Sequence, residues 1–279
     1  MPRSSTYEVV LDAGLFTPTQ LQATAVGRLG FQAGTRWMRD HVGSHRTLVT
    51  RHRVGFVLWA WELEYDNTLR FVDADEARVD VRARVRGPRS SQLEVETTIS
   101  GPAGVAARTR AASVPLRLAG DRALSGTPAG LPEKLVAAFR DDENERSPHR
   151  SQVPALRAEL ERNGERLTPD PTDLPTFRVH RHHCEVADQW YWAESIGFAG
   201  GAREECVRRH GRSTPELRRA LAEGIRRIDA MWLRSGQLWD LLQVRTTAYR
   251  HGADIAFVHE LGLAEDDGGG PHAIVVERT

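Results

Sequence analysis

The hydrophobic pattern of this chain occurs twice: a strand, a long helix and a series of alternating strands appear in each half. In the first half, apolar residues recur at three- and four-residue steps, as in an amphipathic helix: Leu21, Ala25, Val26, Leu29, Ala33 and Trp37. The period then changes to two in segments 54–65, 77–87, 92–100 and 105–118. Alternation of this kind is typical of an antiparallel sheet with one buried face. The first half is therefore predicted to pack one long helix on such a sheet.

Local signals define the start of this half more closely. Residues 7–12 are predicted to form an opening strand, and Thr17 is expected to cap the long helix, with Pro18 in its first turn and Gln20 completing a capping box. Strict alternation along segment 54–65 places one set of side chains on one face: Val57, Trp59, Trp61, Leu63 and Tyr65.

The second half repeats the order. A strand at 176–186 leads to a helix from Trp192 to His210, which Gly211 ends, and a further helix runs from Pro215 to Leu221. Strands follow at 225–234, 238–249, 253–261 and 272–279. Segment 119–172 differs, with expected helices at 131–139 and 153–167 and a Pro-rich connector. The interpretation is an α+β chain with domains at 1–118 and 173–279, joined by a helical linker at 119–172 and derived by duplication.

Composition excludes several classes of protein. The 279 residues carry no formal net charge, which gives no sign of a nucleic-acid partner. Two cysteines form no disulfide framework, no spacing typical of a zinc site is present, and the first ten residues lack the apolar core of a signal peptide. No apolar run approaches ~18 residues, the length that a membrane-spanning helix needs. We expect a cytoplasmic protein without metal, cofactor, nucleic acid or membrane.

Four stretches resemble one known family: STYEVVLDAG at the start, LPEKLVAAF in the linker, and HHCEVADQWYWAESIGF and GAREECVRRHG in the second half. Their order and spacing are similar to those of the tandem hot-dog acyl-acyl-carrier-protein thioesterases. This resemblance implies a double hot-dog fold, in which each half wraps a curved antiparallel sheet around one long helix. It also implies hydrolysis of a thioester on an acyl carrier protein or coenzyme A, without a cofactor.

The resemblance points to specific residues in the loop before the second helix. The family's loop reads Asp-x-Asn-x-His, and the alignment places Glu185, Ala187 and Gln189 at these three polar positions. Glu185 is then the general base or nucleophile, and Gln189 orients water or donates a hydrogen bond to the carbonyl. The structural alternative is that Glu185 caps the helix or pairs with Arg181.

The family also has a Glu on a following strand. Leu233 and Arg234 fall near that position here, and Asp229 or Asp240 would serve if the alignment shifts. Asp12 is interpreted as the first-half equivalent of the loop acid, with a structural role.

Aromatic residues are concentrated where a substrate would bind. Trp190, Tyr191 and Trp192 stand at the start of the second helix, and Trp59 and Trp61, together with Trp37, could line the first-half cavity. As a group they suggest a bulky or aromatic acyl group, including a polyketide one, whereas each taken singly also suits core packing.

Other polar groups have two interpretations. Cys184 is either a nucleophile beside His182 or His183, or a buried and inert thiol. His180, His182 and His183 either bind a metal or are solvated and packing histidines. The segment from Arg203 to Arg234 contains nine arginines and five acidic residues. This excess of positive charge suits either a docking surface for an acidic carrier protein or a solvated face.

Three functions remain open from the sequence. The first is a thioesterase. The second is a hot-dog dehydratase, hydratase or cyclase acting on a thioester-bound intermediate, in which His182 or His183 would supply the base. The third is a non-catalytic protein that binds an acyl chain. Two fused hot dogs can pair within one chain, so a monomer or a homodimer is expected.

Overall fold

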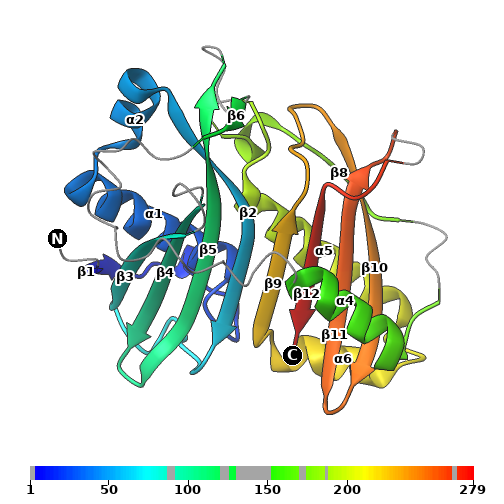
Figure 1. Cartoon of the computed structure of the whole chain (residues 1–279). Helices are drawn as coiled ribbons and strands as arrows, with labels where there is room; N and C mark the ends of the chain where they lie inside the picture. The colour runs from blue at the N-terminus through cyan, green and yellow to red at the C-terminus, as the bar shows by residue number, and fades with distance from the viewer. Residues whose placement is uncertain are drawn as a thin grey trace. The chain divides into compact units, whose positions relative to one another are not determined.

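The computed structural model describes residues 4–86, 92–119, 126–129, 152–169, 174–185, 188–265 and 269–279. The chain divides into two compact units, Met1–His149 and Arg150–Thr279. Each unit packs one long helix on an antiparallel sheet (Figure 1). The α+β class and the repeated order of elements predicted from the sequence are therefore confirmed.

The first unit follows the predicted strand pattern closely. Its strands are β1 (Ser4–Val10), β2 (Val54–Tyr65), β3 (Glu76–Arg86), β4 (Gln92–Gly101), β5 (Gly104–Leu118) and β6 (Gly126–Pro128). They pair antiparallel in the order β1-β3-β4-β5-β2, and β6 adds to β5. Helix α1 (Ala23–His41) packs on β1, β3, β4 and β5, and α2 (His45–His52) packs on β2. All six residues of the predicted apolar stripe are buried.

The start of α1 differs from the prediction. Thr17 caps a local turn rather than the helix, because its hydroxyl oxygen accepts from the N–H of Gln20 at 3.1 Å while its own N–H donates to the Gln20 carbonyl at 2.8 Å. Phe16 and Leu21 pair across this turn, and α1 begins only at Ala23. Short polar side chains such as Thr stabilise turns and helix starts by the same hydrogen bond, so the motif alone does not separate the two.

A bulge in β2 overturns the prediction of strict alternation. The register with β5 shifts between Leu58 and Ala60, so Trp59 is the extra residue. Val57 pairs with Val114 and Trp61 with Ala111. Since these partners are three residues apart on β5, Val57 and Trp61 point to opposite faces.

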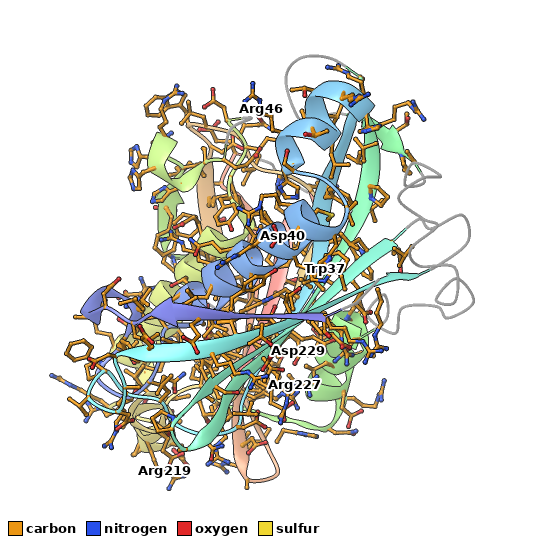
Figure 2. The ribbon with its side chains drawn as sticks, turned by 90° about the vertical axis from the view of Figure 1, so that its left-hand side faces the viewer. Trp37, Asp40, Arg46, Arg219, Arg227 and Asp229 are labelled. Atoms are coloured by element: carbon orange, nitrogen blue, oxygen red, sulfur yellow. The ribbon has the colours of Figure 1, made fainter. Side chains whose placement is uncertain are left out.

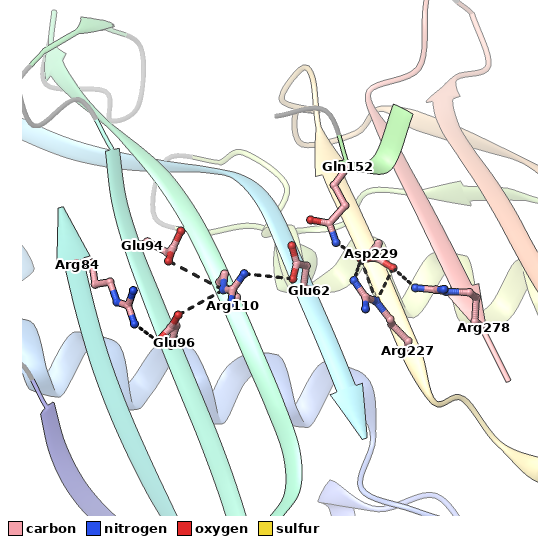
Figure 3. A network of polar contacts seen from close by, with 9 residues as sticks. All are labelled: Glu62, Arg84, Glu94, Glu96, Arg110, Gln152, Arg227, Asp229 and Arg278. Carbon is pink, nitrogen blue, oxygen red and sulfur yellow. Dashed lines mark hydrogen bonds and ion pairs between the residues drawn. The ribbon is translucent and has the colours of Figure 1, made fainter. Parts of the chain in front are cut away.

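The two faces of this sheet differ in polarity. Trp61 and Leu63 are buried on the face that α1 covers. On the other face, Arg110 lies among the carboxylates of Glu62, Glu94 and Glu96 at 3.5–4.0 Å (Figure 3).

The second unit has strands β7 (Glu165–Arg166), β8 (Thr176–Arg178), β9 (Arg227–Trp232), β10 (Leu241–His251), β11 (Asp254–Leu263) and β12 (Ala273–Arg278). They pair antiparallel in the order β9-β12-β11-β10-β7, and β8 adds to β10. Helix α5 (Trp192–His210) ends at Gly211 as predicted, and α6 (Pro215–Glu223) follows it.

Helices cover both faces of the second sheet. Ala256 and Val258 of β11 pack against α4 (Gln152–Asn163), whereas Ile255 and Phe257 pack with α5 and α6. Burial on both faces explains why β9 and β12 lack exposed alternate positions.

The expected linker is described only in part. Helix α4 confirms most of the helix predicted at 153–167, but it ends at Asn163, and Glu165–Arg166 form β7 instead of a last helical turn. The helix expected at 131–139 lies outside the described residues. The predicted boundaries at 118 and 172 stay predictions. Within the described ranges, no helix combines the length and apolar character needed to cross a membrane.

Candidate active site

The described residues between β8 and α5, which include Glu185 and Gln189, form turns where the sequence predicted a continuous strand to residue 185. Residue 186, the last of that predicted strand, lies outside the described residues. Strand β8 ends at Arg178, and the 3-10 turn η5 (Arg181–His183) follows it. Two histidines make this turn. The N–H of His180 donates to Nδ1 of His183 at 3.1 Å, and the N–H of His183 donates to the carbonyl of His180 at 2.9 Å. This reciprocal cap ends the strand that the sequence pattern alone would continue.

Glu185 and Gln189 lie opposite each other across a tight turn. The N–H of Glu185 donates to the carbonyl of Gln189 at 2.9 Å, and the N–H of Asp188 donates to the carbonyl of Glu185 at 3.1 Å. Asp188 has a φ of 55°, a left-handed conformation that Asp tolerates better than most residues. Both Glu185 and Gln189 are half-buried. The two predicted catalytic residues are therefore neighbours, although their roles stay a proposal.

A second loop holds this turn in place. The N–H of Trp190 donates to the carbonyl of Gly236 at 3.1 Å, and Gln189 pairs with Gln237. The Trp190 ring lies so close to Gly236 that a Cβ there would be 2.6 Å from its Cε3 atom. The loop at 234–240 is a part of the site that sequence reasoning missed, although its Ser-Gly pair is a turn signal.

We expect Gly236→Ala to destabilise the site locally, because the added methyl group collides with the buried Trp190 ring. Overpacking of this kind costs about 1–3 kcal/mol of unfolding free energy. Urea unfolding followed by fluorescence measures it. Gly262→Ala is the matched control, since a Cβ there meets nothing within 4 Å. Equal effects of the two changes would contradict the close packing at Trp190.

The turn leads directly into the N-terminus of α5. Tyr191 is the N-cap residue, and its N–H donates to the carbonyl of His183 at 2.7 Å. Helix N-termini carry partial positive charge and direct N–H groups outward, which favours a developing negative charge nearby. The Trp192 ring stacks edge-on against Trp232 with centroids 5.7 Å apart. The predicted trio Trp190, Tyr191 and Trp192 thus lies at the loop and helix start.

The corresponding loop of the first unit has the same hydrogen bonds. Thr17 N–H to Gln20 carbonyl matches Glu185 to Gln189, and Gln22 N–H to the Leu15 carbonyl matches Tyr191 to His183. By this correspondence Thr17, not Asp12, is the first-unit equivalent of Glu185.

Asp12 instead matches His180. It is the N-cap of the 3-10 turn η1 (Ala13–Leu15), where its Oδ1 accepts from the N–H of Gly14 at 2.7 Å. The structural role predicted for Asp12 fits this capping bond. Its predicted equivalence to Glu185 is wrong, because the two residues share a charge but occupy different positions in the hydrogen-bond pattern of their loops.

The structural alternatives for Glu185 can be compared with the contacts. Arg181 forms its ion pair with Asp188, at 3.0 Å, and the N-cap of α5 is Tyr191. A cap of α5 therefore does not account for Glu185, whereas its pairing with Arg181 stays a prediction.

Cys184 is poorly suited to be a nucleophile. Burial raises the pKa of its thiol, Asp188 raises it further, and Arg181 only partly opposes them. A nucleophilic cysteine needs the opposite environment, one that favours the thiolate.

The three histidines lie together around η5. The ring centroids of His182 and His183 are 3.9 Å apart, and His180 lies 5.9 Å from each. His183 also contacts Phe198 of α5 edge-on. In the part of the chain that the structure describes, no group of His, Cys, Asp or Glu is arranged to hold a metal ion.

Of the acids considered on the following strand, Asp240 lies beside the loop and Asp229 does not. Asp240 Oδ2 accepts from the N–H of Gln237, the residue that pairs with Gln189. Asp229 is fully buried, held by Arg227, Arg278 and Gln152 (Figure 3). Asp240 is therefore the one of these two that is placed to act at the site. Leu233, at the aligned position, is half exposed and apolar.

The first-unit tryptophans have separate environments. Trp37, on α1 (Figure 2), and Trp61 are both buried to about 2% exposure, and Trp59 is half-buried at the bulge. Their contact with substrate stays a prediction.

Many of the arginines expected to form a docking surface are used within the chain. Arg203 pairs with the buried Glu277, Arg208 and Arg209 pair with Glu205, and Arg227 pairs with Asp229. These four charges are thus largely neutralised by the chain's own acids.

Comparison with known proteins gives a likeness in structure alone: no family model and no curated protein sequence matches this chain. Three solved structures match along almost its whole length. One is assigned as an oleoyl thioesterase from Lactobacillus plantarum, with 11% identity, a TM-score of 0.70 and coverage of 99% of this chain and 95% of that one. An acyl-ACP thioesterase from Bacteroides thetaiotaomicron has 11% identity, a TM-score of 0.65 and coverage of 99% and 97%.

The third is the 12:0-ACP thioesterase from Umbellularia californica, with 10% identity, a TM-score of 0.66 and coverage of 99% and 93%. The chain therefore has the double hot-dog fold of these proteins, as the resemblance implied. At such low identity the likeness establishes the fold and leaves the reaction to be argued from the site.

Proposed function

We propose that this chain is a thioesterase that hydrolyses an acyl thioester carried by an acyl carrier protein or by coenzyme A. The observation that carries the proposal is the turn that joins Glu185 to Gln189 and leads into the N-terminus of α5. This turn makes a residue with a carboxylate and a residue with a side-chain amide neighbours, two residues before a helix N-terminus. The three structural neighbours, each described as a thioesterase, support this choice among hot-dog activities.

In the proposed reaction, the Glu185 carboxylate takes a proton from a water molecule while the water oxygen adds to the thioester carbonyl carbon. Gln189 orients that water or donates a hydrogen bond to the carbonyl oxygen. The N-terminus of α5 stabilises the negative charge that develops on this oxygen. The C–S bond then breaks and the thiolate takes the proton from Glu185, so that an acid and a thiol leave. Glu185 acting first as nucleophile gives the same products through an anhydride.

The acyl group is proposed to be bulky or aromatic, of a polyketide type, instead of a long linear chain. In the first unit, a Cβ at Gly34 of α1 would lie 3.2 Å from Val95, and one at Gly30 would lie 3.3 Å from Thr109. Helix and sheet therefore touch there and leave no room for an alkyl chain beside these glycines. In the second unit, Arg203 of α5 binds the buried Glu277 of β12 and fills the same layer. Both observations support a compact substrate.

We also propose a cytoplasmic location, which the free thiols of Cys184 and Cys206 suit.

The test is to incubate the purified protein with aromatic, branched and long linear acyl thioesters of both carriers. Free thiol and product mass are followed together. We expect thiol release, fastest with the compact acyl groups. A change of one water in mass without thiol release would indicate a dehydratase or hydratase, and saturable binding without turnover would indicate a binding protein. A uniform preference for long linear chains would contradict the proposed acyl class.

A further inference from the structure

The turn that precedes Glu185 and Gln189 includes a hydrogen bond to an imidazole nitrogen. His183 Nδ1 accepts from the N–H of His180, so the neutral His183 ring carries its proton on Nε2. The carbonyl of His183 in turn accepts from the N–H of Tyr191 at 2.7 Å, where α5 begins. We call the bond from His180 N–H to His183 Nδ1 the His183 cap. It orients His183, whose carbonyl accepts the N–H of the residue at the start of α5.

We propose that His183 is a positioning residue whose cap makes the order of the loop, defined as Cys184, Glu185 and residues 188–191, depend on pH. A protonated imidazole carries hydrogen on both nitrogens and cannot accept the His180 N–H. Uptake of one proton therefore removes the cap and leaves a charge beside two more histidines. The consequence for catalysis rests on the proposed thioesterase function, whereas the consequence for loop order does not.

The surroundings of His183 oppose its protonation on balance. Burial lowers the pKa of His183, and His182 and His180 lower it further, while Glu194 of α5 and a hydrogen bond with the backbone of Arg178 act in the opposite direction. Two other groups lie near this turn. Arg181 forms an ion pair with Asp188, and the exposed Trp239 ring makes an edge-to-face contact with His180. A pKa below the ordinary histidine value means that the ordered loop binds fewer protons than the open one. Order is therefore complete above about pH 6.5 and is lost as the pH falls below it.

The first unit provides an internal comparison. Its equivalent turn is capped by the carboxylate of Asp12, which accepts from Gly14 N–H at 2.7 Å. A carboxylate accepts hydrogen bonds throughout the range in which histidine titrates. The loops of the two units have matching backbone hydrogen bonds but different capping groups. The first unit uses a carboxylate, and the unit that contains Glu185 uses an imidazole.

The test is amide hydrogen exchange on the full chain at pH 7.5 and pH 5, corrected for intrinsic exchange rates. We expect protection of the Glu185 and Tyr191 amides to fall on acidification, by up to about tenfold for each pH unit, the limit for one proton. The equivalent amides of Thr17 and Gln22 serve as the control, and the ratio of their protection at pH 7.5 to that at pH 5 should stay near one. Nitrogen NMR of the His183 ring should report Nε2–H at pH 7.5. The proposal would be overturned if protection of the Glu185 and Tyr191 amides were the same at both pH values. It would also be overturned if protection fell equally in the loops of both units.

Variants separate titration from packing. His183→Gln places a non-titrating acceptor at the position where Gln completes an ordinary capping box. We expect it to keep loop protection at pH 7.5 and to abolish the fall at pH 5. His183→Ala should lower protection at both pH values, and His52→Asn, an exposed histidine of the first unit, should behave as the wild type. A wild-type pH response in His183→Gln would refute the role of His183, whether or not the protein hydrolyses thioesters.

Discussion

Glu185→Gln should lower kcat for thioester hydrolysis by about 10²–10⁴-fold, the usual contribution of a general base. The amide has nearly the same size as the carboxylate but cannot take a proton from water. The backbone bonds of Glu185 with Gln189 and Asp188 are retained in the variant. Steady-state thiol release measures the loss, and circular dichroism checks the fold.

Two further variants make this result decisive. Glu223→Gln removes an exposed carboxylate at the end of α6 in the same unit and should retain wild-type activity. Asp240→Asn tests the other acid beside the loop, which accepts from Gln237 N–H. Full activity in Glu185→Gln, with loss in Asp240→Asn, would transfer the role of base to Asp240. Full activity in both would remove the carboxylate mechanism altogether.

The regular elements could be predicted because their signals are local and repeated. The helix expected from Trp192 to His210 has those bounds in the structure, since an apolar period and a terminal Gly211 both act within a few residues. The strand expected at 54–65 likewise coincides with β2.

The parts that could not be predicted depend on contacts between distant residues. The bulge at Trp59 is visible only when β2 is paired with β5. The turn at His180 needs the ring of His183 as an acceptor, and a pattern of polarity does not report ring orientation. In the same way, the support of Trp190 by Gly236 joins residues 46 positions apart. Sequence reasoning therefore identified the residues of the loop, but not its conformation or the loop at 234–240 that packs against it.

Glu277→Gln should lower the free energy of unfolding by about 3–5 kcal/mol, the cost of leaving a buried charge without its partner. Glu277 is 2% exposed, and its Oε2 lies 2.6 Å from Arg203 Nη1 and 3.2 Å from His259 Nε2. His259 is fully buried, and its other ring nitrogen bonds Thr246 at 2.8 Å. Gln preserves the volume of the side chain, so the loss reports charge and hydrogen bonding instead of a cavity.

The pH dependence of this loss follows from the surroundings of Glu277. Burial opposes ionisation, but Arg203 and His259 together hold the pKa of Glu277 below its ordinary value. The stabilisation is therefore present above the ordinary glutamate pKa of about 4.3 and is lost as the pH falls through the lower pKa of the folded state. Urea unfolding at pH 7 and pH 3 should show the difference between wild type and variant shrinking at the lower pH.

Glu205→Gln is the matched control on the exposed side of α5. Hydrogen bonds from Arg208 and Arg209 lower the pKa of Glu205 to about 2, yet this carboxylate contacts solvent. Solvent and salt screen such pairs, so we expect a loss of less than about 1 kcal/mol.

A double-mutant cycle then isolates the buried pair. Because Arg203→Met removes the charge that Glu277→Gln leaves stranded, the two changes together should cost at least about 1 kcal/mol less than their sum. Additive losses would mean that Arg203 and Glu277 contribute independently, and the buried pair would then not be the element that joins α5 to β12.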